Sequence, residues 1–185
     1  MISAAYKNLI SKLQPLGISE DMLVFGDGRQ DASVMLIGEA PGKDEVLQKK
    51  PFCGKAGKNL DEFLAATGIR REELFITNTV KFRPYKIGAS GRKSNRPPTK
   101  KEIAICRECL LEEIRILSPK IIVTLGNTAL HAVLGDDKTI GEVHGQLIGN
   151  VFALYHPASI IYRRELAPVY RKDMEKLAAI IGGMQ

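Results

Sequence analysis

The sequence has few cysteines, few aromatic side chains and no long apolar run. Its 185 residues include three cysteines, and 6% are aromatic. An odd and sparse set of cysteines argues against the disulfide framework of a small secreted protein and favours a reducing, intracellular setting. No basic-then-apolar leader opens the chain, and no apolar run approaches the roughly 20 residues of a membrane helix. We therefore expect a soluble, cytoplasmic protein with no membrane partner.

The composition is that of a folded globular protein. With 44% hydrophobic and 26% charged residues, 17 glycines and nine prolines, the chain is neither disordered, nor collagen-like, nor a coiled coil. A chain of this length buries roughly 70% of its unfolded surface, so its core needs no metal or disulfide. We expect a single domain over 1–185. A dinucleotide fingerprint is missing, because Gly26-Asp27-Gly28 lacks the third glycine.

The net charge of +6 is modest, but the cations are clustered. Between residues 81 and 107 a single acid, Glu102, stands among nine cations: Lys81, Arg83, Lys86, Arg92, Lys93, Arg96, Lys100, Lys101 and Arg107. Such a run suits a polyanion, although a solvated basic loop has the same composition.

Strand and helix patterns alternate along the chain. Apolar runs at 34–37, 74–80, 120–125 and 151–155 predict buried parallel strands. Helical periodicity predicts helices at 4–13, 60–67, 99–118, 127–134 and 168–181. Thr99 and Glu102 have the spacing of a capping box at the start of one of them. The alternation predicts an α/β domain with helices on both faces of a parallel sheet, and segment 83–98 is expected to be an irregular functional loop.

Polar residues stand where the predicted strands end. Glu39 follows the first strand, Asn78 lies near the end of the second, and His156 follows the fourth. Ligands of open α/β sheets bind at the carboxyl ends of the strands, so we expect these side chains to converge. Phe52 lies in a glycine-rich loop before a helix, where backbone amides can meet a phosphate. Each residue also has a structural explanation: a turn, a loop contact, a strand cap or, for Phe52, core packing.

Four ordered motifs, at 38–42, 51–57, 76–81 and 156–158, resemble those of uracil-DNA glycosylases, and most closely those of the iron–sulfur branch called family four. The likeness extends from about residue 25 to 164. It implies a three-layer sandwich around a central four-stranded parallel sheet. It also implies a DNA repair enzyme that flips deoxyuridine out of the helix and hydrolyses its N-glycosidic bond, which releases uracil and leaves an abasic site.

The resemblance implies a role for each site residue. Phe52 stacks on uracil, the Asn78 amide accepts from N3–H and donates to O4, and the Ala40 amide contacts the base. His156 donates to the oxygen O2 of the departing uracil. Glu39 orients or activates the attacking water, or biases the charge of the sugar.

The resemblance also places the DNA contacts. The expected contacts are Lys55, Arg92, Lys93, Arg96, Ser159, Ile160 and Arg163. Ile160 and Ile161 are the candidates for an apolar wedge that fills the gap left by the flipped base.

The chain departs from the family-four pattern at the cysteines. That branch carries four cysteine ligands, but only Cys106 matches, and Phe82 stands where another ligand is expected. We expect no metal and no cofactor, with Cys106 and Cys109 as half-buried core thiols. The insert at 84–98 contains no histidine of the kind with which a related branch traps DNA covalently, so we expect ordinary turnover with water.

Three other functions stay open. The same scaffold could act on hypoxanthine or xanthine, could bind DNA damage without catalysis, or could be an unrelated small-molecule hydrolase. We expect a monomer that associates with the nucleoid through DNA. The sequence does not decide between single- and double-stranded DNA.

Overall fold

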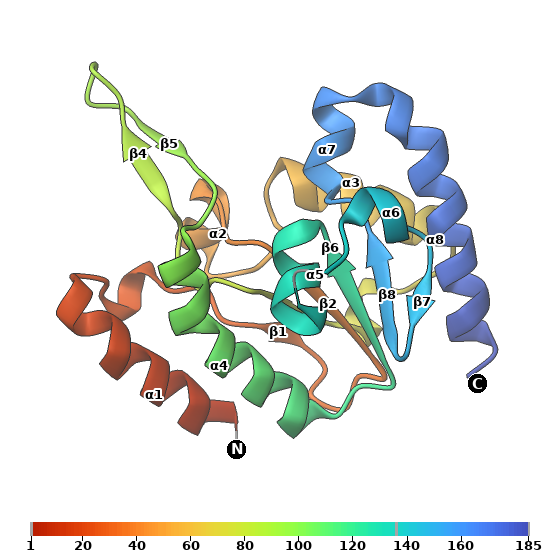
Figure 1. The fold of residues 1–185 in the computed structure, drawn as a ribbon, viewed down its shortest axis with the longest axis horizontal. Helices are drawn as coiled ribbons and strands as arrows, with labels where there is room; N and C mark the ends of the chain where they lie inside the picture. The colour runs from red at the N-terminus through yellow and green to blue at the C-terminus, as the bar shows by residue number, and fades with distance from the viewer. Residues whose placement is uncertain (1, 136, 185) are drawn as a thin grey trace.

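The computed structural model describes residues 2–135 and 137–184, and in this part of the chain a six-stranded sheet lies between layers of helices (Figure 1). The strand order is β1-β3-β2-β6-β8-β7. The central, mutually parallel strands are β3 (Phe75–Asn78), β2 (Val34–Gly38), β6 (Ile121–Leu125) and β8 (Val151–Leu154). Two short antiparallel edge strands flank them, β1 (Asp27–Gly28) and β7 (Leu147–Ile148). The predicted parallel sheet is confirmed, and the edge strands extend it.

Alternate residues of β2 enter cores on opposite faces of the sheet. Val34 and Leu36 pack in one core, whereas Met35 and Ile37 pack in the other. The first core is covered by α3 (Lys55–Ala66) and α8 (Ala167–Gly182), and the second by α4 (Lys100–Leu117) and α5 (Asn127–Leu134). Because both faces are covered, the strand reads as a continuous apolar run rather than an alternating one.

The five helices expected from periodicity are present. Four cover the sheet, and α1 (Ile2–Leu13) packs on the outer side of α4 (Figure 1). The structure adds three helices too short to give a periodic signal: α2 (Lys43–Gln48), α6 (Ile140–Val143) and α7 (Pro157–Tyr162). Single 3-10 turns occupy Gln14–Leu16, Glu20–Met22, Arg71–Glu73 and Arg164–Leu166. No helix within 2–135 or 137–184 has the length and apolarity needed to cross a bilayer.

Segment 83–98 is a β-hairpin and not the irregular loop that its composition predicts. Its strands β4 (Tyr85–Ile87) and β5 (Lys93–Asn95) pair antiparallel, and the hairpin projects from the body of the protein (Figure 1). Both strands are exposed, so they carry no buried apolar alternation from which a hairpin could be predicted.

Arg96 fastens the base of this hairpin to α4. Its guanidinium makes two hydrogen bonds, of 2.7 and 2.8 Å, to the carboxylate of Glu102. Glu102 also accepts from the Thr99 amide in the predicted capping box. The Arg96 hydrogen bonds lower the pKa of Glu102 to about 2. Arg96 therefore has an anionic partner within the protein.

Lys81 belongs to the core and not to the basic surface expected from the cation run. Its buried ammonium donates to Glu113 Oε2, Thr77 Oγ1 and the Asn78 carbonyl, each at 2.6 Å. The carboxylate of Glu113 is also buried and accepts from the Tyr6 hydroxyl at 2.8 Å. This network ties the end of β3 to α4 and α1.

We predict that Lys81→Met and Glu113→Leu each lower the free energy of unfolding by about 3–5 kcal/mol, because each leaves one buried charge unpaired. The double variant should lose less than the sum of the two, since no buried charge is left. Urea unfolding measures all three. The control is Glu112→Leu, which breaks a solvent-exposed pair with Arg115 that contributes little to stability. Single variants no less stable than this control would contradict the prediction.

Candidate active site

The polar residues expected at the site lie where parallel strands end. Glu39 directly follows β2, Asn78 is the last residue of β3, and His156 comes two residues after β8. The register pairs Gly38 with Asn78 across the two neighbouring strands. The carboxyl ends of the strands share one edge, so these residues from distant parts of the chain share it as well.

Gly38 leaves room for the side chains of Asn78 and Phe52. A Cβ at this position would overlap Asn78 Oδ1 and lie 2.5 Å from Phe52 Cζ. The Phe52 ring centroid lies 5.8 Å from the His156 ring centroid. The structure therefore brings Phe52, Asn78 and His156 together at the end of β2, in a space that only glycine leaves open.

Asn78 carries an unsatisfied acceptor. Its side chain is 3% exposed, and Oδ1 has no hydrogen-bond partner among the described residues. A buried polar atom without a partner costs about 1–3 kcal/mol. A buried polar atom without a partner requires an explanation, and a role in binding a ligand is one of them.

The loop that carries Phe52 is strained and held from several sides. Phe52 has a φ of 52°, in the left-handed region that non-glycine residues rarely adopt. Arg71 Nη2 donates to the Pro51 carbonyl at 2.8 Å. A Cβ on Gly57 would overlap the Phe52 carbonyl oxygen, so this glycine lets the loop lie on the first turn of α3. Phe52 is also part of the apolar core, so its core packing and its place at the site hold together.

Glu45 joins the two glycine-rich loops of the site. Its Oε2 accepts from the Gly42 amide and its Oε1 from the Gly54 amide, both at 3.1 Å. One carboxylate therefore fixes the loop after β2 relative to the loop that carries Phe52. The Gly54 amide at the start of α3, a position expected to meet a phosphate, is thereby occupied.

The environment of His156 defines its protonation. Its Nδ1 accepts a hydrogen bond of 3.1 Å from the Ala158 amide, so the proton of the neutral ring lies on Nε2. Burial lowers the pKa of His156 to about 4, and the ring is neutral at physiological pH. A Cβ on Gly126, whose φ is 87°, would lie 3.2 Å from His156 Cβ, so glycine gives the ring room. The site thus has a neutral imidazole with an N–H donor.

Glu39 is held by a residue from a third strand end. The Thr128 hydroxyl, at the start of α5 after β6, donates to Glu39 Oε2. Both side chains are half-buried. The hydrogen bond orients the carboxylate, and its other oxygen, Oε1, remains available to a water molecule.

The sequence patterns do not predict three residues of the site, which are Gly38, Thr128 and Glu45. Gly38 lies within the motif at 38–42, but its closeness to Asn78 and Phe52 depends on strand register. Thr128 follows a predicted strand at the same edge, and that position is the signal that could have found it. Glu45 has capping-box spacing from Gly42, but nothing in the sequence indicates its second contact.

Burial changes the assignment of the wedge. Ile160 is 9% exposed and packs in the core with α3 and α8, so the prediction that it enters DNA is corrected. Ile161 is 39% exposed and Tyr162 is 85% exposed. On the short helix α7, these two side chains are the accessible ones beyond His156.

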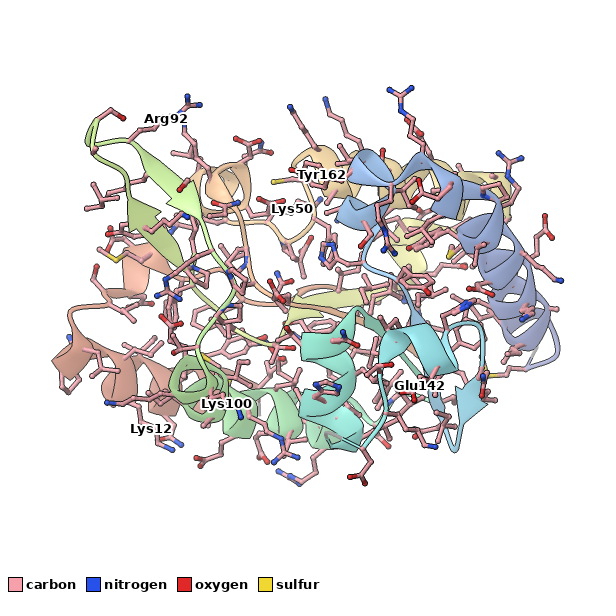
Figure 2. The ribbon with its side chains drawn as sticks, turned by 45° about the horizontal axis from the view of Figure 1, so that its top comes forward. Lys12, Lys50, Arg92, Lys100, Glu142 and Tyr162 are labelled. Carbon is pink, nitrogen blue, oxygen red and sulfur yellow. The ribbon has the colours of Figure 1, made fainter. Side chains whose placement is uncertain are left out.

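The expected cationic contacts lie around this edge of the sheet. Lys55, Arg92, Lys93 and Arg163 are exposed, and Ser159 is half-buried. Figure 2 shows Arg92 of the hairpin, Lys50 of the loop before α3 and Tyr162 of α7 along one rim of the protein, opposite Lys12 and Lys100. Tyr162 ends α7, the helix that begins directly after His156, and Lys50 lies two residues before Phe52.

The doubly covered parallel sheet thus has a carboxylate, an amide and an imidazole at one edge. Residues 25–179 match the uracil DNA glycosylase superfamily, and the chain belongs to this superfamily. It is similar to the type-4 uracil-DNA glycosylase of Archaeoglobus fulgidus, with 36% identity over 88% of this chain and 83% of the relative. The type-4 uracil-DNA glycosylase of Thermotoga maritima is 37% identical over 90% of this chain and 87% of the relative.

A crystal structure of SMUG2 from Pedobacter heparinus shares the fold. Its TM-score is 0.55 at 18% identity, over 83% of this chain and 76% of that chain. The likeness supports the layered arrangement of helices around the sheet.

The cysteines of this chain do not fit the iron–sulfur cluster that resemblance to family four implies. Cys106 and Cys109 are buried with Phe82 and Val80, and burial raises the pKa of both thiols, that of Cys109 to about 12. Cys53 does not belong to this apolar cluster and lies in the loop beside Phe52. No group of three or more potential metal ligands occurs within the part of the chain that the structure describes. A cluster needs four thiolates as a rule. The chain has three cysteines, and two of them pack among apolar side chains.

We predict that Glu45→Ala lowers the free energy of unfolding by about 1–3 kcal/mol, because two backbone donors lose a charged acceptor. The amide protons of Gly42 and Gly54 should also exchange faster with solvent. Denaturant unfolding and hydrogen exchange measure the two effects. The control is Glu62→Ala, an exposed residue on α3. Unchanged exchange at both glycines would show that Glu45 does not join the loops.

Proposed function

We propose that the protein is a uracil-DNA glycosylase that uses water as its nucleophile and no metal. It rotates deoxyuridine out of the DNA, hydrolyses the N-glycosidic bond, releases uracil and leaves an abasic site. The observation that supports this most directly is the unpartnered Oδ1 of Asn78, next to an aromatic ring and a neutral imidazole.

Base recognition rests on Asn78 and Phe52. The buried Oδ1 of Asn78 accepts from uracil N3–H, and the amide nitrogen donates to O4. Cytosine presents a donor where O4 would be and an acceptor at N3, so it would leave buried groups mismatched. Phe52 stacks on the flat pyrimidine, and the Ala40 amide, in the turn after Glu39, is a further contact to the base.

His156 stabilises the departing uracil as a neutral donor. Negative charge develops on O2 as the bond breaks, and a fixed N–H aimed at this oxygen stabilises the transition state more than the substrate. Since Nδ1 is occupied by the Ala158 amide, the donor is Nε2–H. The ring needs no positive charge for this task.

Glu39 acts on the other side of the bond. Its carboxylate orients the attacking water and favours the positive charge that develops on the sugar. Thr128 acts as a positioning residue, because it holds one carboxylate oxygen and leaves the other for water.

We propose that the rim with Arg92, Lys50 and Tyr162 in Figure 2 binds the DNA. Lys55, Arg92, Lys93 and Arg163 are proposed to bind phosphates, with Ser159 beside them. Tyr162 and Ile161 replace Ile160 as the side chains that fill the vacated gap. We further propose that the enzyme acts as a monomer, in the cytoplasm and associated with the nucleoid through DNA.

The activity is tested with a labelled DNA strand that carries one uracil, treated with alkali after incubation with the protein. The parent protein should give strand breaks at the uracil. His156→Ala should lower kcat by about 10²–10³, the loss typical of one transition-state donor, and Asn78→Ala should lower kcat/KM by about tenfold or more. His131→Ala and Asn150→Ala, outside the site, are the matched controls. Intact strands from the parent protein would refute the enzyme, and equal cleavage by all variants would refute the site.

The pKa of His156 predicts the pH dependence of kcat. The ring gains a proton only as the pH falls through about 4, so its Nε2–H donor is unchanged between about pH 5 and pH 8. We expect no inflection of kcat near the ordinary histidine pKa of about 6.5. Steady-state rates across this range measure the pH dependence of kcat. Folding is checked at each pH. A fall in activity above about pH 6.5 that His156→Gln abolishes would show that the charged ring is needed.

A further inference from the structure

A groove of about 660 Å³ runs between the hairpin, α2 and the segment after α1. Within the described residues, ten large hydrophobic side chains are exposed, and half of them line this groove: Leu16, Met22, Leu47, Tyr85 and Ile87. Scattered exposed hydrophobic residues need no explanation, but a contiguous set marks a binding surface.

One face of the hairpin forms a wall of this groove. The register places Tyr85 opposite Asn95 and Ile87 opposite Lys93, so Tyr85, Ile87 and Lys93 share a face. The Lys93 ammonium lies over the Tyr85 ring, 4.4 Å from its centroid. An aromatic ring beside a cation is a pairing typical of surfaces that bind single-stranded nucleic acid.

The charge of the groove is positive. Four cations line it, Lys43, Arg83, Lys93 and Arg96, together with one acid, Glu102. Glu102 is paired with Arg96 through two hydrogen bonds. The remaining three cations are available to a polyanion, and the apolar side chains between them suit flat bases rather than phosphates.

The groove begins next to the proposed active site. Helix α2 starts at Lys43, four residues after Glu39. A Cβ on Gly42 would lie 3.4 Å from Asn95 Nδ2, so the hairpin contacts the loop that follows β2. The hairpin also carries Arg92 on the rim shown in Figure 2. A strand that leaves the site on this side would run along the groove.

We propose that this groove binds single-stranded DNA on one side of the flipped deoxyuridine, with unstacked bases against Tyr85 and Ile87 and phosphates at Lys43, Arg83 and Lys93. The inference rests on the proposed function and adds a strand preference to it. A paired duplex hides its base faces in the stack, so it cannot use the apolar wall. An acidic segment of a partner protein is the other chemistry that the groove could accept, but continuity with the site favours DNA.

The test compares uracil oligonucleotides with flanks of different length and strandedness. The substrates are a short strand of about five nucleotides, strands of about twenty extended on the 5′ or the 3′ side only, and the matching duplexes. For the parent protein, extension on one of the two sides should lower KM. The double variant Tyr85→Ala/Ile87→Ala should raise KM about tenfold on that extended single strand, the factor expected when base stacking is lost. The increase should shrink as the flank shortens, with kcat unchanged on all substrates.

A double variant elsewhere controls for the loss of exposed apolar surface. Leu134→Ala/Leu147→Ala removes two comparably exposed side chains outside the groove and should leave every KM at its parent value. Thermal unfolding of both variants checks that they are folded. Equal KM for the parent and the Tyr85→Ala/Ile87→Ala variant on every single strand would overturn the proposal. Absence of uracil release by the parent protein would instead refute the proposed function, so the two failures are distinct.

Discussion

The buried ammonium of Lys81 holds the end of β3, and the proposed base-binding residue depends on it. Lys81 donates to the carbonyl of Asn78, the residue whose side chain carries the free acceptor. It pairs with the buried carboxylate of Glu113 of α4, which also accepts from Tyr6 of α1. A buried ion pair is a poor source of net stability, because desolvation offsets most of its attraction. Its consequence here is positional, since one network sets the end of β3 relative to two helices.

The site concentrates features that are unfavourable taken singly. Asn78 has a buried acceptor without a partner, Phe52 adopts a left-handed backbone conformation, and His156 is desolvated. Such features persist where the surrounding structure overdetermines them, and they are found at functional sites. Here the loop is fastened by Glu45 and Arg71, and His156 by the Ala158 amide. The rest of the fold therefore maintains these unfavourable features at the proposed site.

The chain belongs to the uracil DNA glycosylase superfamily but lacks the four cysteines that an iron–sulfur cluster requires as a rule. Cys106 lies among apolar side chains, with Phe82 and Val80 in the same cluster. The connection after β3 is held instead by the Lys81 network and by the fork between Arg96 and Glu102. These contacts anchor the hairpin at its base and leave its strands exposed, where they form one wall of the apolar groove.

The sequence by itself determined the parallel sheet, the five longer helices and the strand ends that carry Glu39, Asn78 and His156. These follow from local information, since apolar runs, helical periodicity and capping residues act over a few neighbours. Only the tertiary structure decided that Lys81 and Ile160 are buried, that segment 83–98 is a hairpin and that Thr128 binds Glu39. Burial and pairing between residues far apart in the chain depend on register and packing. A lysine in a basic run and an isoleucine beside a basic loop read the same in sequence whether they face water or the core.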